Sequence, residues 1–142
     1  MYPSYHAGFG AIFAAILYIL FPGIGLIGAC LIFLSSFLAD FDHYLIYVKR
    51  KKDLSIKRAY GYFVKMSKDL YDRKLKRAPL LFLHTIEFAA LLVIFSFAVH
   101  WLFYIALGLL FHMLMDFIEL KKHNRLDIKG FSIVEDYFLK RK

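Results

Sequence analysis

The sequence has almost no cysteine and, over two long stretches, no positive charge. Cys30 is the single cysteine, so neither a disulfide framework nor a cysteine-based zinc site can form within the chain. No Lys or Arg occurs before Lys49 or between Arg77 and Lys121, although Lys and Arg number 19 against 11 Asp and Glu. A pI near 9.6 is common among nucleic-acid binders. Basic residues confined to two segments are instead typical of the cytoplasmic flanks of membrane spans, and we expect no nucleic-acid partner.

The stretches without basic residues are apolar. The chain is 61% hydrophobic with a mean hydropathy of +0.57, which is more than a soluble domain of 142 residues usually buries. Pro22-Gly23 predicts a turn between the first two apolar segments, and Trp101 marks an interfacial position between the last two. The four segments approach the length of about 20 residues that crosses a bilayer, and they cover residues 7–21, 24–39, 80–99 and 101–118.

Two hairpins of this kind predict an all-α fold, an integral membrane four-helix bundle that forms one domain over residues 1–142. Both turns would face outward, while the N-terminus, the basic segment 49–79 and the tail 119–142 would be cytoplasmic. We therefore expect a multi-pass protein of the cell inner membrane, in contact with anionic lipid head groups.

Each basic segment also contains a helix signal. In residues 49–79, apolar side chains recur at spacings of three and four among Lys and Arg, which predicts an amphipathic helix on the membrane surface. These are Ile56, Tyr60, Phe63, Met66 and Leu70. In the tail, Ser132-Ile133-Val134-Glu135 has the form of a capping box and predicts a short final helix.

Ionisable residues gather at the predicted cytoplasmic ends of the four spans. Antiparallel helices bring these ends together, so we expect residues far apart in sequence to become neighbours in space. Spacings of three or four place Asp40 with His43, His84 with Glu87, and His112 with Asp116 on shared helix faces. The complete set of candidate ligands is His6, Asp40, Asp42, His43, His84, Glu87, His112 and Asp116.

Imidazole and carboxylate groups in such pairs bind zinc, manganese and non-haem iron in helical bundles. Eight candidates exceed the need of one tetrahedral zinc, so the pattern predicts two divalent ions, with zinc favoured over manganese or iron. Ionisable groups inside a bilayer are costly unless paired or ligated, which leaves a purely structural polar network as the alternative. His100 and His123 lie apart from the set. Glu119 is either a ninth ligand or an interfacial charge near Lys122.

Four motifs in this order resemble a known family. They are His6 with Gly8 and Gly10, Asp40-Phe41-Asp42-His43, His84-Thr85, and His112 with Asp116. The chain is similar to the YdjM-type small inner-membrane proteins, described as membrane-bound metal-dependent hydrolases and distantly similar to the zinc-dependent phospholipase C and nuclease superfamily. It departs from their pattern at Ala39, where Pro is frequent, and lacks a His-Arg pair before His84.

The resemblance implies hydrolysis of a phosphoester, and the residues favour the same chemistry. We expect a metal-activated water to attack a phospholipid or lipid-linked phosphate at the cytoplasmic interface, with Asp116 catalytic and Glu87 either a ligand or the general base. No Ser or Cys stands beside a matched base, which disfavours a covalent route. One alternative is a non-catalytic protein whose metal clamps the helices or recruits a partner. A metal-ion transporter is a weaker alternative, because the outer half of the spans has few polar residues.

Overall fold

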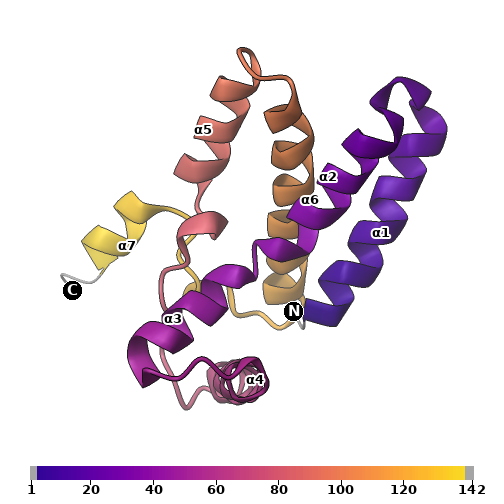
Figure 1. The fold of residues 1–142 in the computed structure, drawn as a ribbon. Helices are drawn as coiled ribbons and strands as arrows, with labels where there is room; N and C mark the ends of the chain where they lie inside the picture. The colour runs from indigo at the N-terminus through magenta and orange to yellow at the C-terminus, as the bar shows by residue number, and fades with distance from the viewer. Residues whose placement is uncertain (1–2, 140–142) are drawn as a thin grey trace.

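The computed structural model describes residues 3–139, and every regular element among them is helical. α1 (Pro3–Leu20) and α2 (Gly25–Leu38) form an antiparallel pair around η1 (Pro22–Ile24), which confirms the predicted turn. α5 (Ile86–Ser96) and α6 (Trp101–Lys122) form a second pair, and α6 contacts α1, α2 and α5. Both turns lie at the same end of the molecule, at the top of Figure 1.

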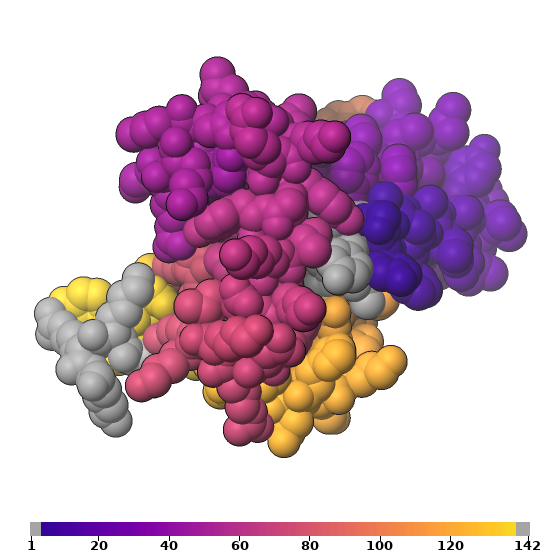
Figure 2. Space-filling view, turned by 90° about the horizontal axis from the view of Figure 1, so that it is seen from below, coloured from indigo at the N-terminus to yellow at the C-terminus, as the bar shows by residue number. Residues whose placement is uncertain are grey.

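The remaining helices lie toward the opposite end. α3 (Phe41–Lys51) follows α2 after a break, α4 (Ile56–Tyr71) returns against α3, and η2 (Phe82–His84) precedes α5. η3 (Leu126–Ile128) and α7 (Ile133–Leu139) follow α6. Seen from below, α4 and the chain after it lie across the middle of this face, with α1 to the right (Figure 2). The predicted helices in segment 49–79 and in the tail are thus present as α4 and α7.

Both of these helices begin with a serine cap, of which the sequence predicted the one at Ser132. Ser55 Oγ accepts a hydrogen bond from the Arg58 amide at 3.4 Å at the start of α4. Ser132 Oγ accepts one from the Glu135 amide at 3.2 Å at the start of α7. The apolar face of α4, however, turns toward α3 and the end of α2, where Ala59 is buried.

Two helical runs are long and apolar enough to cross a membrane by length and composition, Pro22–Lys51 and Trp101–Lys122. α1 and α5 are apolar but shorter. Large apolar side chains are exposed on α1, α2, α5 and α6, for example Ile19, Leu26, Ile94 and Leu114. A helix that is apolar on its outer face as well as its inner face is expected in a protein core or in lipid.

Glycines allow α2 to lie very close to its neighbours. A Cβ at Gly108 would stand 2.2 Å from the Ile32 carbonyl oxygen, and one at Gly10 would stand 1.9 Å from Ser36 Oγ. Small residues of this kind permit close backbone approach between helices in lipid. α2 is therefore held between α1 and α6, and this fixes how the ends of the three helices are aligned.

We predict that Gly108→Ala lowers the thermal midpoint of the detergent-solubilised protein, because the added methyl group meets backbone atoms of α2. Overpacking of this kind costs about 1–3 kcal/mol. Gly8→Ala is the matched control, since a Cβ there would meet nothing within 4 Å. Equal midpoints for the two variants would contradict the close α2–α6 contact.

Candidate metal centre

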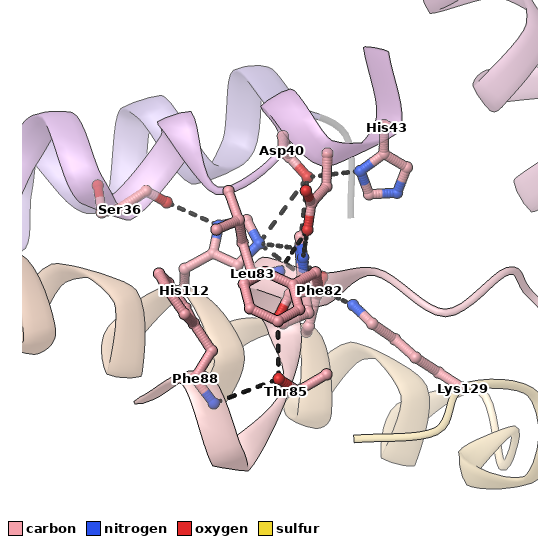
Figure 3. A network of polar contacts seen from close by, with 12 residues as sticks. Ser36, Asp40, His43, Phe82, Leu83, Thr85, Phe88, His112 and Lys129 are labelled. Carbon is pink, nitrogen blue, oxygen red and sulfur yellow. Dashed lines mark hydrogen bonds and ion pairs between the residues drawn. The ribbon is translucent and has the colours of Figure 1, made fainter. Parts of the chain in front are cut away.

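Six buried or partly buried side chains converge where α1 begins, α2 ends, α5 begins and α6 ends. They form three overlapping groups, each with ligand atoms within 4.8 Å of one another: His6, Asp40 and His112; Asp40, His43 and His84; and His84, His112 and Asp116. Figure 3 shows Asp40, His43 and His112 directed toward one another. The described residues therefore include a His and Asp cluster that could hold a metal ion.

Asp40 enters the cluster because the helix breaks beside it. The amides of Asp40, Asp42 and His43 bond to carbonyls three residues back, so the chain tightens between α2 and α3. The spacing prediction holds here, since His43 Nδ1 lies 3.4 Å from Asp40 Oδ1. Asp40 Oδ1 also lies 3.8 Å from His112 Nε2 and 3.9 Å from His84 Nε2. One carboxylate thus faces three imidazoles.

A hydrogen bond to α2 orients His112. Its Nδ1 donates to the Ser36 carbonyl oxygen at 2.7 Å, so in the neutral ring Nε2 keeps its lone pair toward the cluster. That Nε2 lies 2.8 Å from His84 Nε2, which must then be the donor. An outer carbonyl partner of this kind is the usual support of a metal-binding histidine.

The same geometry gives a role to Asp42. It is buried, accepts a hydrogen bond from the Leu83 amide, and has Oδ2 3.8 Å from His84 Nδ1. An ion bound at His84 Nε2 would replace that proton, and the neutral ring would then carry its proton on Nδ1, which faces Asp42. Asp42, predicted as a ligand, belongs to none of the three ligand groups and lies on the far side of the His84 ring from them.

Asp116 is the carboxylate in contact with the most distant parts of the chain. Its Oδ1 lies 3.2 Å from His6 Nε2, and its Oδ2 lies 3.8 Å from the Nε2 atoms of His84 and His112. The spacing of four between His112 and Asp116 therefore places both on one face of α6, as predicted. Lys129 Nζ also donates to Asp116 Oδ2.

Lys129 was not among the predicted site residues. It follows η3 and reaches the cluster from the tail (Figure 3). The tail is held there by the buried Arg125, which donates to the carbonyls of Leu70 and Tyr71 at the end of α4. In the sequence Lys129 is one of several basic residues of the tail, and no spacing pattern distinguishes it from those that face solvent.

Glu87 lies apart from the ligand groups. His84 ends η2 and Thr85 has extended backbone angles, with its Oγ1 capping α5. The prediction that His84 and Glu87 share a helix face is therefore wrong. The Glu87 carboxylate accepts instead from Ser132 Oγ at 2.5 Å and from the first amides of α7, where a negative charge is favourable.

The excluded histidines also lie elsewhere. His100 Nε2 pairs with the Tyr104 hydroxyl at 3.1 Å near the turn between α5 and α6. The His123 ring packs on Tyr71, with ring centres 4.5 Å apart. Glu119 belongs to none of the three ligand groups.

The chemistry of the six side chains fits a divalent cation. The side chains of His6, His84 and His112 are at most 1% exposed. Buried atoms without a hydrogen bond gather here, including His6 Nδ1, Asp40 Oδ2 and His84 Nδ1. Unpaired buried polar atoms are costly, and a cation bound between nitrogen and carboxylate oxygen would offset that cost.

Comparison with protein-family models, curated proteins and solved structures gives no match. The assignment of the centre therefore rests on its geometry.

We predict that His84→Ala and His112→Ala each lower the metal content of protein purified without added metal, because each removes a buried ligand shared by two groups. His100→Ala should leave the content unchanged. Asp42→Asn should weaken binding by about 10–100-fold while keeping the site, as loss of an outer-shell partner does. The measurement is ions per chain by elemental analysis, with chelator competition for Asp42→Asn. Wild-type metal content in all of the variants would contradict the assignment.

Proposed function

We propose that the chain is a four-span protein of the inner membrane, with the metal centre at its cytoplasmic face. The exposed apolar side chains of α1, α2, α5 and α6 support this arrangement, as does the gathering of Lys and Arg in the segments around α3, α4 and the tail. The end that carries both turns has no Lys or Arg in its connections, residues 21–24 and 97–100. This distribution agrees with the positive-inside rule.

We infer that the centre binds two divalent ions, with Asp40 between them. The groups of His6, Asp40 and His112 and of Asp40, His43 and His84 share only Asp40. A carboxylate has two oxygens and can bridge two ions, whereas each imidazole offers these groups a single nitrogen. Zinc is the favoured metal, because imidazole and carboxylate ligands suit it.

The function that this centre supports best is hydrolysis of a phosphoester. Bound divalent ions would lower the pKa of a water and neutralise charge on phosphoryl oxygens. Asp116 belongs to the group with His84 and His112 but to neither of the two groups that share Asp40. Its carboxylate lies close enough to these histidines to orient a metal-bound water or accept its proton. The Lys129 ammonium next to it would attract the phosphoryl group. Because the capping of α7 occupies Glu87, Asp116 is the stronger candidate for general base.

The observation that carries this proposal is the convergence of four His and two Asp side chains in a small polar site beside a basic surface. A cavity of about 70 Å³ adjoins it, lined by Asp40, His43, Asp116 and Lys129 among others. The motif order that resembles the YdjM-type hydrolases is consistent with the same activity. A substrate in the membrane, a phospholipid or lipid-linked phosphate, suits a centre at head-group depth.

Topology can be tested by cysteine labelling in a Cys30→Ser background. Lys76→Cys and Lys121→Cys should react with an impermeant maleimide only from the cytoplasmic side, and Gly23→Cys only from the outer side. These positions are exposed and lie at opposite ends of the molecule. Labelling of Lys76→Cys and Lys121→Cys from opposite sides would exclude four spans.

We predict that metal-loaded protein in liposomes releases phosphate or head group from a phospholipid or lipid-linked phosphate, and that Asp116→Asn abolishes this release. The amide keeps the volume of the carboxylate but can neither accept a proton nor carry its charge, so a loss of at least about 100-fold is expected. Glu87→Gln is the control and should retain activity, with a less stable tail. A wild-type protein that binds two ions but hydrolyses no member of a broad lipid panel would favour the structural-clamp alternative.

A further inference from the structure

An apolar groove runs between α4 and the region where α2 passes into α3. Its volume is about 390 Å³. One wall carries Phe37, Leu38 and Phe41, and the other is one face of α4, including Ile56 and Phe63. Ligand sites for small molecules are mostly apolar and have volumes of about 300–1,000 Å³. The groove therefore has the size and lining of a site for a small apolar ligand.

The groove adjoins the candidate metal centre. Asp40 and His43 line the groove, and they also line the small cavity that contains Asp116 and Lys129. The His43 ring makes an edge contact with Phe63, with centres 4.7 Å apart. A ligand in the groove thus meets apolar side chains along its length and the candidate metal ligands at one place.

The groove also opens to the apolar exterior. Leu38, Phe41 and Ile56 are each about half exposed or more. Leu38 belongs to α2, whose outer face is apolar along its length. In a membrane these side chains would face hydrocarbon, so a lipid chain could enter without crossing a polar surface.

The wall formed by α4 is held in place from its N-terminal end. Arg58 pairs with Asp53 through two hydrogen bonds of 2.7 Å, and the Tyr47 hydroxyl of α3 donates to the same carboxylate. The Arg58 guanidinium holds the pKa of Asp53 well below its usual range. Ala59 is buried and lies on the face of α4 that lines the groove, while Lys57, Lys65 and Lys68 are exposed. α4 thus separates an apolar groove from a positively charged surface.

We propose that this groove binds one acyl chain of an anionic bilayer phospholipid, whose phosphate then lies at the metal centre. A helix of a second copy is a poorer fit, because one turn of a helix about 10 Å wide and 5.4 Å long already occupies about 400 Å³. A single chain needs only a narrow apolar channel, and the Lys129 ammonium, which lines the adjoining cavity, matches an anionic head group. The positioning of the phosphate rests on the proposed function, whereas binding of the chain does not.

The test uses full-length protein in amphipol and a fluorescent lysophosphatidylglycerol with a labelled chain. Wild type should bind it saturably, one molecule per protein, and unlabelled lysophosphatidylglycerols should compete better as their chains lengthen. Ala59→Trp fills the groove and should weaken binding about tenfold, equivalent to losing contact with about two methylenes. Gly61→Trp is the matched control, because Gly61 is exposed with nothing within 4 Å of a Cβ.

A second variant keeps the test decisive if Ala59→Trp does not fold. Phe41→Ser removes an exposed wall residue without adding volume and should also weaken binding, with metal content unchanged. Equal binding by wild type and both groove variants would overturn the inference, as would cross-linking of Tyr60→Cys to a second copy in place of probe binding.

The failure of this inference is distinguishable from that of the proposed function. Chain-length-dependent binding by a metal-loaded protein that hydrolyses nothing would support the groove and contradict the hydrolase. Hydrolysis at equal rates in wild type, Ala59→Trp and Gly61→Trp, without saturable binding of the probe, would support the hydrolase and contradict the groove.

Discussion

The burial of several ionisable side chains at one end of an apolar helical assembly is the constraint on which the rest of the structure depends. Carboxylates and imidazoles removed from water need partners. Asp40 and Asp116 find them in four histidines and one lysine, drawn from α1, α3, η2, α6 and the tail. No single helix could supply this set. The complete set of partners therefore forms only when five segments of the chain meet at one place.

The packing of the apolar helices also brings the polar side chains of the site together. Gly10 and Gly108 let α1 and α6 lie against α2 at a distance that longer side chains would prevent. The same approach brings His112 within 2.7 Å of the Ser36 carbonyl oxygen, so the helix packing itself sets the tautomer of a site histidine. A shift of α6 along α2 would break this hydrogen bond and turn the ring away from Asp40. Packing and site chemistry are thus one geometric requirement.

The sequence was sufficient for the features that depend on periodicity. Apolar stretches, the Pro22-Gly23 turn and the spacing of His112 and Asp116 predicted helices whose polar ends meet, and the structure has that arrangement. Prediction failed where a local helix cap or a long-range contact determines the position of a side chain. Thr85 begins α5 after His84, so a spacing of three did not give a shared face with Glu87. Lys129 reaches Asp116 through the folding of the tail, which no local pattern encodes.

The place of Lys129 has a consequence for how an ion would enter. An ammonium group tethered beside Asp116 acts as an internal counterion, present at a high effective concentration because it belongs to the same chain. An incoming cation must compete with it for the same carboxylate oxygen. The apparent affinity for a metal ion would therefore be lower than the ligand set alone would give, and the carboxylate would keep a compensating charge while the ion exchanges. Through Lys129 the tail would link the occupancy of such a centre to the folding of the last part of the chain.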